Sequence, residues 1–257
     1  MTSLTIAVRG HDFNVLPTPR YARFWRNCAQ GLWEPGTFEV LDQHVRPNGY
    51  LIDIGAWIGP ITLYAAARGS RVTAFEPDLR SLAEIRANVD LNPSLRHLIQ
   101  IEPYALAATT SIAELYGKGL GRSGTTLSPA ILQNGEIFYL NSLAICKTLD
   151  VLLASETYRF RCANLIKIDV EGAEYEIIPR LARFLGDSYV PILISFHPQK
   201  VPRMDLKEGT SRVLSALSSY RAYIVGEELA PVADDQIISM TCTGEIREHV
   251  LFFSRNF

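Results

Sequence analysis

Short, almost entirely apolar segments alternate with segments of helical periodicity from residue 49 onward, and this alternation restricts the fold more than any other feature. A strand that is apolar along its whole length is expected to be buried on both faces of a sheet. The pattern predicts strands over residues 50–54, 71–75, 98–101, 165–170 and 191–196, and helices over about 60–68, 78–92 and between the last two strands. We therefore expect a doubly wound α/β fold with a mostly parallel, Rossmann-like sheet of seven strands.

The segments before and after this alternation are expected to extend the same unit. At 257 residues, the chain is long enough for one large domain with a modest extension. Residues 1–46 predict a strand pair and two helices packed on the core, and residues 47–257 predict the main domain. The tail, about 220–254, is expected to form strands, including an antiparallel edge.

A glycine turn follows the first core strand and predicts a ligand site. It contains Asp53, Gly55, Ala56, Trp57 and Gly59. Gly55 permits a sharp turn, and Gly59 lets the backbone approach a ligand without a Cβ. Glu76 ends the next strand, where an acidic side chain accepts hydrogen bonds from ribose hydroxyls.

The spacing of these residues distinguishes two cofactor classes. A nicotinamide site is typical of Gly-x-Gly-x-x-Gly, whereas this chain has Asp-x-Gly-x-x-x-Gly followed by Pro60, which removes one N–H donor. S-adenosylmethionine has no phosphate. Its ammonium group suits Asp53 and its ribose suits Glu76. We therefore expect S-adenosylmethionine to be the cofactor.

A second polar segment follows the strand at 165–170. Asp169, Glu171 and Glu174 lie within one turn of chain, beyond the carboxyl end of a strand, where ligands bind in open α/β sheets. Such carboxylates can hold a divalent cation, orient a hydroxyl or accept a proton. For Asp169 and Glu171 we favour a catalytic role. For Glu174 we favour stabilisation of the positive end of the following helix.

Taken together, the two segments resemble the FkbM family of methyltransferases over about residues 24–200. The resemblance rests on residues 53–59, 75–77, 88–92 and 167–174, with Trp33-Glu34-Pro35, Thr37 and residues 148–150 in addition. It implies a class I methyltransferase fold and S-adenosylmethionine-dependent O-methyl transfer to a hydroxyl, often on a sugar or a secondary metabolite.

One departure from the family concerns the strand at 191–196. The family often has a glutamate two residues before a histidine, and here the run is Ser195-Phe196-His197. His197 stays a candidate base, together with Asp169 and Glu171. The same three residues could bind Mg²⁺ or Mn²⁺, but few anionic ligands are left without a carboxylate at 195, so we favour a metal-free reaction.

Weaker indications concern the remainder of the site. Tyr104 and Ala105, after the third strand, are candidates for the adenine edge, and Glu34 for the methionine end. Residues 117–133 are rich in Gly, Ser and Thr, which is typical of a lid that closes over the acceptor.

Charge and cysteine content limit the partners and the compartment. A net charge of −2 without a basic stripe argues against nucleic-acid binding, and no segment is apolar enough to predict a membrane span. The four cysteines are widely spaced, so reduced thiols in a cytoplasmic protein are expected. Two alternatives stay open: a nicotinamide-dependent oxidoreductase, and a non-catalytic binding module of the same fold.

Overall fold

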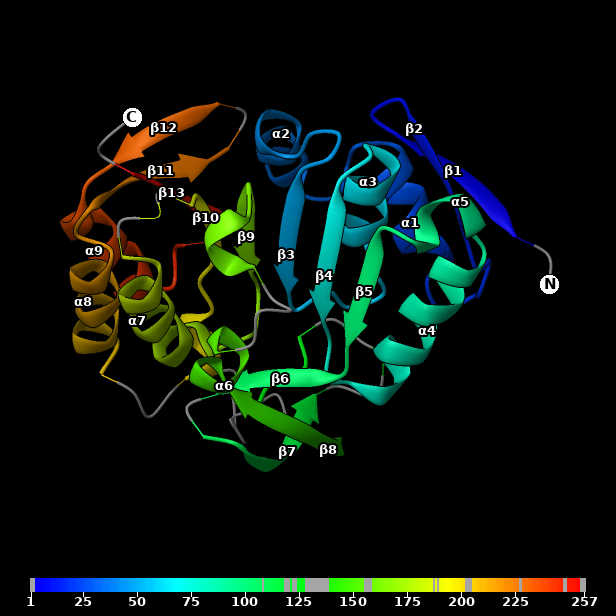
Figure 1. Cartoon of the computed structure of the whole chain (residues 1–257). Helices are drawn as coiled ribbons and strands as arrows, with labels where there is room; N and C mark the ends of the chain where they lie inside the picture. Colours follow the sequence, from blue (N-terminus) through cyan, green and yellow to red (C-terminus); the bar gives the residue numbers. More distant parts are fainter. Residues whose placement is uncertain are drawn as a thin grey trace.

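The computed structural model describes residues 3–107, 109–117, 121, 124–127, 139–154, 159–186, 188, 190–201, 205–226, 228–246 and 249–254. The main sheet has eight strands, in the order β12 (Leu229–Val232), β11 (Tyr220–Val225), β13 (His249–Ser254), β10 (Ile192–Ser195), β9 (Leu165–Ile168), β3 (Tyr50–Ile54), β4 (Arg71–Phe75) and β5 (Ile99–Glu102). The five strands from β10 to β5 are parallel, and β13, β11 and β12 join antiparallel. The predicted doubly wound sheet is confirmed, with eight strands in place of seven because β12 adds an edge (Figure 1).

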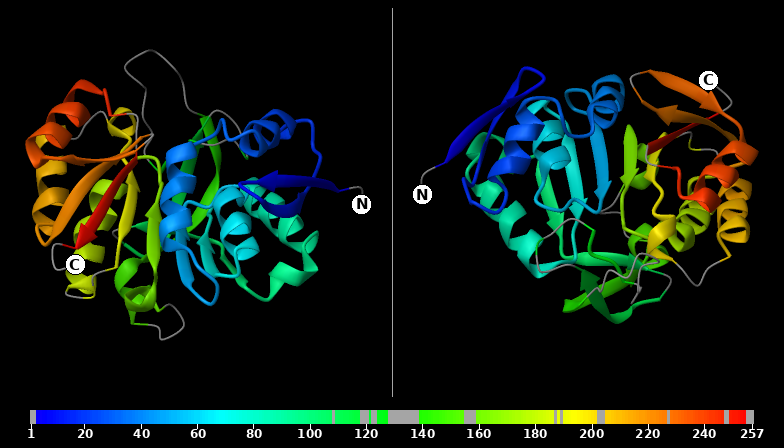
Figure 2. Two further views of the ribbon diagram at one scale, coloured as in Figure 1. Left: turned by 90° about the horizontal axis from the view of Figure 1, so that it is seen from above. Right: turned by 180° about the vertical axis from the view of Figure 1, so that it is seen from behind.

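Two hydrophobic clusters cover the two faces of this sheet. In β3, Ile52 and Ile54 belong to one cluster and Leu51 to the other, because successive side chains of a strand point to opposite faces. The first cluster is completed by α7 (Glu174–Leu185), α8 (Leu206–Ala216) and α9 (Asp234–Thr243), and the second by α1 (Ala22–Ala29), α2 (Pro35–His44), α3 (Pro60–Ala67) and α4 (Leu79–Asp90). Helices therefore lie on both faces, as Figure 2 shows.

The N-terminal segment packs onto the second cluster. A hairpin of β1 (Leu4–Val8) and β2 (His11–Val15) precedes α1, and its Phe13 shares the cluster with Trp25 of α1, which has no exposed surface. The amide side chains of Asn88 and Asn92 accept hydrogen bonds from the backbone of Leu16 and Asn14 at 2.8 Å each. The hairpin is thereby fixed to the end of α4.

Helix termini in this part of the chain follow local rules. Pro60 opens α3 at a first-turn position, as expected of a residue without an N–H to bond. Asp78 caps α4 by accepting hydrogen bonds from the backbone of Arg80 and Ser81. Four short helical turns complete the described helices: α5 (Pro93–Arg96), α6 (Leu149–Leu153), η1 (Phe160–Cys162) and η2 (Pro198–Lys200).

A second sheet of three strands was not predicted from the sequence. It consists of β6 (Tyr104–Ala107), β8 (Tyr139–Thr148) and β7 (Ser111–Gly117), in that spatial order. Figure 1 shows it lying across the carboxyl ends of β4 and β5. It therefore closes one side of the region where ligands are expected.

The prediction for the tail needs correction, and the segment expected to form a lid is described only in part. The tail expected to form strands contains α9 between β12 and β13, and Gln236 of this helix accepts a hydrogen bond from the backbone of Ala233 at 3.0 Å, which caps its first turn. Of the expected lid at 117–133, only residues 117, 121 and 124–127 are described, and the others lie outside the described residues. In the described part of the chain, no helix is long and apolar enough to cross a membrane.

Candidate active site

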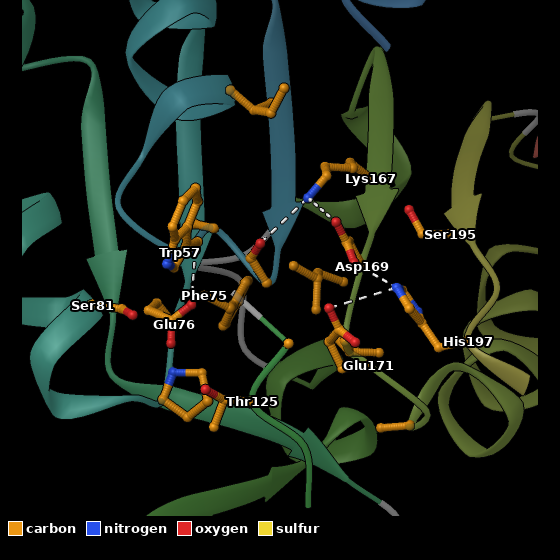
Figure 3. A pocket seen from close by; sticks show the side chains of 18 of the residues that line it. Trp57, Phe75, Glu76, Ser81, Thr125, Lys167, Asp169, Glu171, Ser195 and His197 are labelled. Carbon is orange, nitrogen blue, oxygen red and sulfur yellow. Dashed lines mark hydrogen bonds and ion pairs between the residues drawn. The ribbon is translucent and has the colours of Figure 1, made fainter. Parts of the chain in front are cut away.

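A cavity of about 940 Å³ lies at the carboxyl ends of β3, β4, β9 and β10. Three groups of residues line it: the ends of these strands, residues of α1 and the segment before α2, and the inner side of the small sheet. Among the sequence-predicted site residues, those lining it are Glu34, Gly55, Ala56, Trp57, Glu76, Tyr104, Ala105, Asp169, Glu171 and His197. Figure 3 shows that Glu76, which follows β4, and Asp169 and Glu171, which follow β9, face this space from its two sides.

Gly55 occupies a position that only glycine fits. Its φ of +86° is a left-handed conformation, and a Cβ there would lie 1.8 Å from the carbonyl oxygen of Asp169. The turn after β3 and the end of β9 therefore touch through bare backbone. This close approach brings Gly55 and Asp169 to the same wall of the cavity.

Gly59 has a different role from the predicted one. It has a φ of +90°, but its missing Cβ faces Ile85 of α4, whose Cγ1 would lie 2.7 Å from it. Gly59 does not line the cavity, so its small size serves the packing of α4 against the turn, not the approach of a ligand.

Glu76 is held by the backbone around it. Its Oε2 accepts a hydrogen bond from Trp57 N at 2.8 Å, and its Oε1 accepts one from Asp78 N at 2.7 Å. Burial raises the pKa of Glu76 to about 8, although these two hydrogen bonds counteract the rise. The carboxyl group is thus fixed in place while its cavity side stays open to a ligand (Figure 3).

Asp53 does not reach the cavity. Its side chain has no exposed surface and accepts a hydrogen bond from Thr62 Oγ1 at 2.8 Å. Its other oxygen, Oδ1, lies 3.5 Å from Nζ of Lys167. Asp53, which was predicted to bind the ammonium group of a cofactor, is therefore paired with a buried lysine and does not line the cavity.

Lys167 connects the two predicted segments, and sequence reasoning did not single it out. Its Nζ lies 3.4 Å from Asp169 Oδ2 and donates a hydrogen bond to the carbonyl oxygen of Gly55 at 3.3 Å. Burial alone would lower the pKa of Lys167, but Asp169 and Asp53 outweigh it and raise the pKa above its usual value. Lys167 therefore stays charged although it is 3% exposed.

Asp169, Glu171 and His197, which we call the Glu171 group, meet at the end of β9. His197 Nε2 lies 3.5 Å from Asp169 Oδ1 and 3.7 Å from Glu171 Oε1. Glu171 has a φ of +53°, a conformation that non-glycine residues seldom adopt and that is often found at functional sites. Its Oε2 is 3.3 Å from Nζ of Lys200.

Asp169 also belongs to a second set, the Glu34 group, with Glu34 and His249. His249 starts β13, opposite Ser195 at the end of β10. His249 Nε2 lies 3.4 Å from Glu34 Oε2, and neither atom has a hydrogen bond within the described residues. Burial raises the pKa of Glu34 to about 7 and lowers that of His249 to about 4.

The Glu171 group and the Glu34 group each contain residue types that can bind a metal ion. In each group the three possible ligand atoms lie within 4.8 Å of one another. Two lysines already contact carboxylates of these groups, however. Lys167 contacts Asp169, and Lys200 contacts Glu171. These positive charges oppose the binding of a further cation.

Aromatic side chains from the N-terminal segment form a further wall of the cavity. The ring of Phe24 lies 4.5 Å from that of Trp57 and 5.0 Å from that of Trp33, both edge-on. Trp57 Nε1 donates a hydrogen bond to the carbonyl oxygen of Gly121 at 3.0 Å, and Tyr21 OH donates another at 2.7 Å. The described part of the expected lid therefore contacts this aromatic wall.

A family model matches most of the chain. The model of the methyltransferase FkbM domain matches residues 53–224, about two thirds of the chain and both polar segments. The chain belongs to the FkbM methyltransferase family. Among curated proteins, no sequence matches it.

Several solved structures of methyltransferases are similar to the chain at low identity. An FkbM methyltransferase from Methylobacillus flagellatus has 15% identity and a TM-score of 0.47, over 88% of this chain and 54% of that one. A TehB-like S-adenosylmethionine-dependent methyltransferase from Corynebacterium glutamicum has 14% identity and a TM-score of 0.47, and the match covers 92% of this chain and 97% of that one. An S-adenosylmethionine-dependent O-methyltransferase from Thermotoga maritima has 12% identity and a TM-score of 0.44, and the match covers 86% of this chain and 64% of that one. The chain spans about half the length of the Methylobacillus protein, and these likenesses do not identify a substrate.

Proposed function

We propose that this FkbM-family chain transfers a methyl group from S-adenosylmethionine to a hydroxyl of a small molecule, such as a sugar or a secondary metabolite. One observation carries the proposal. A buried carboxyl group at the end of β4 and two carboxylates after β9 line the same cavity, on either side of the Gly55 turn. This is the edge of an open α/β sheet where ligands bind.

The polar groups of the cavity fit the two ends of this cofactor. Glu76 offers carboxylate oxygens to ribose hydroxyls. Glu34 Oε2 and His249 Nε2, which lack hydrogen bonds in the described structure, lie beside Asp169 and suit the ammonium and carboxylate of an amino acid. When bound, the cofactor supplies a methyl group on a positively charged sulfur.

The proton of the acceptor hydroxyl goes to a carboxylate in this proposal. The carboxylates around His197 raise its pKa to about 10 although burial opposes the rise, so the ring is already protonated at neutral pH. Burial raises the pKa of Glu171, whereas Lys167 and His197 lower that of Asp169 against the effect of burial. Glu171 is therefore the better proton acceptor, and Asp169 orients the hydroxyl.

The cofactor, the acceptor and these two carboxylates are sufficient for methyl transfer. A bound cofactor would supply the methyl group to the acceptor oxygen and keep the electron pair of the broken carbon–sulfur bond on its sulfur, while Glu171 takes the hydroxyl proton and Asp169 orients the hydroxyl. The residues of the cavity contribute mainly alignment and the exclusion of water. Because Lys167 and Lys200 occupy the carboxylates that a cation would need, we favour a reaction without metal.

Mass spectrometry of the purified protein under native conditions tests the choice of cofactor. We expect retained S-adenosylmethionine or S-adenosylhomocysteine, or micromolar binding of added S-adenosylhomocysteine in calorimetry. Retention or preferential binding of a nicotinamide nucleotide would favour the oxidoreductase instead. Binding of S-adenosylmethionine without turnover on any acceptor would favour a non-catalytic module.

A further inference from the structure

Glu174 connects two parts of the active site through backbone hydrogen bonds. It opens α7, and its side chain has no exposed surface. Its Oε2 accepts a hydrogen bond from Gly172 N at 2.7 Å, and its Oε1 accepts one from His197 N at 2.6 Å. The turn that carries Glu171 is thereby fixed to the segment after β10. Stabilisation of the helix end alone does not account for these two bonds.

The imidazole ring of His197 is held from both sides. Its Nδ1 lies 3.5 Å from Glu174 Oε1, and its Nε2 faces Asp169 and Glu171 in the cavity. Nδ1 has no hydrogen bond within the described residues, and its contact with the carboxylate of Glu174 is an ion pair. The ring therefore forms a bridge between a buried carboxylate and the two carboxylates that face the cavity.

The other titratable groups near the ring are Glu34, which lies beside Asp169, and residues of three further elements. Lys167 of β9 contacts Asp169, and Lys200 of η2 contacts Glu171. His249 of β13 lies on the far side of Asp169, and burial keeps its pKa low, at about 4, so it adds no charge at neutral pH. Asp169 and Glu171 thus each contact one lysine and His197.

We propose that Glu174 is a positioning residue for methyl transfer, which holds His197 so that the imidazolium orients Asp169 and Glu171 toward the acceptor. The expected effect on turnover rests on the proposed function. The positioning of His197 by Glu174 does not depend on that function. Without the negative charge of Glu174, the ring keeps its cavity contacts but loses the partner that fixes Nδ1 and opposes its rotation.

The variant Glu174→Gln keeps the size of the side chain and removes its charge. We expect the imidazole pKa of His197, measured by NMR on protein with labelled histidines, to fall by about one unit or more, which is tenfold in proton binding. The NMR signal of His197 is identified as the one that is missing from the variant His197→Gln. Affinity for S-adenosylhomocysteine should stay within about threefold, while kcat on the acceptor found by screening falls by roughly 10- to 100-fold.

Glu176→Gln is the matched control, since Glu176 lies exposed in the first turn of the same helix. It should change neither the pKa of His197 nor kcat. An unchanged His197 pKa in Glu174→Gln would overturn the proposal, and so would an unchanged kcat. If Glu174→Gln does not fold, His197→Gln decides instead, because it removes the ring and leaves Glu174 bonded to the backbone. Wild-type kcat in that variant would contradict the proposal.

The proposed function and the positioning role of Glu174 can be tested separately. If the wild-type protein methylates no hydroxylated acceptor, the proposed function is wrong. The imidazole titration needs no acceptor, so it still decides whether Glu174 controls the state of His197. If wild type and Glu174→Gln turn over equally well, the proposed function stands and the positioning role is wrong.

Discussion

Lys167 and Asp169 form an ion pair, with Nζ 3.4 Å from Oδ2, in which the lysine is buried and the carboxylate lines the cavity at the end of β9. The two residues lie two positions apart, so their side chains leave the chain on the same side. Asp53 approaches the same ammonium from β3. One lysine therefore balances a carboxylate of the core and a carboxylate of the active site.

Replacement of Lys167 by methionine should destabilise the protein strongly. The change leaves Asp53 buried without its positive partner, and breaking a buried pair in this way costs about 3–5 kcal/mol. Urea denaturation measures the loss in free energy of unfolding. Lys207→Met, at an exposed position of α8, is the control and should change stability little. A loss below about 1 kcal/mol in Lys167→Met would mean that the lysine does not balance these charges.

Gly55 and Gly10 provide a matched pair of alanine substitutions. Both have positive φ, but a Cβ at Gly10 meets nothing within 4 Å, whereas one at Gly55 meets the Asp169 carbonyl at 1.8 Å. Gly10→Ala should cost only about 1–2 kcal/mol of stability, the usual effect of a left-handed conformation, and leave cofactor affinity unchanged. Gly55→Ala should abolish binding of S-adenosylhomocysteine in calorimetry. Normal binding in that variant would show that the turn is not part of the cofactor site.

Replacement of Glu76 by alanine should weaken cofactor binding by about 1.5–3 kcal/mol, the usual contribution of hydrogen bonds to a charged group. The effect should depend on pH, because burial raises the pKa of Glu76 to about 8 in the free protein. The carboxylate form binds hydroxyls better, so the ratio of wild-type to variant affinity should rise about tenfold between pH 7 and pH 9. Taking the ratio cancels the titration of the cofactor's own amino group. A ratio that is constant or that falls would remove Glu76 from the ribose site.

Removal of metal ions should leave turnover unchanged. Lys167 and Lys200 contact the carboxylates of the Glu171 group, which opposes a divalent cation there. Dialysis against EDTA followed by an activity assay measures this directly. Lost activity that Mg²⁺ or Mn²⁺ restores would overturn the metal-free account and make the Glu171 group or the Glu34 group a metal site.

The central strands could be predicted from the sequence because burial on both faces leaves an unmixed apolar run. The strand at 71–75 is observed as Arg71–Phe75, and Tyr50–Ile54 likewise has its predicted bounds. The small sheet was missed because its strands are only partly buried. Ile112 and Leu143, for example, are 72% and 59% exposed, so their hydrophobicity does not follow an inward face. In α9, the β-branched pair Ile237 and Ile238 favours a strand locally, and packing against α8 decides for a helix.

The polar residues of the site were easiest to predict where they follow a strand directly. Asp169 and Glu76 lie at strand ends, and the edge of the sheet brings them to one cavity. His249 could not be found in this way, because it reaches Glu34 through the antiparallel register of β13 against β10. Lys167 lies inside an apolar strand, where the sequence alone does not reveal that it contacts two carboxylates, Asp53 in the core and Asp169 in the cavity wall.

The most direct test of the account is transfer of labelled methyl groups from S-adenosylmethionine to a panel of sugars and other hydroxylated small molecules, followed by NMR of the product. We expect an O-methyl ether, and we expect Asp169→Asn to reduce the rate by roughly 100-fold while binding of S-adenosylhomocysteine persists. A product methylated on nitrogen or carbon, or wild-type turnover in Asp169→Asn, would contradict the account.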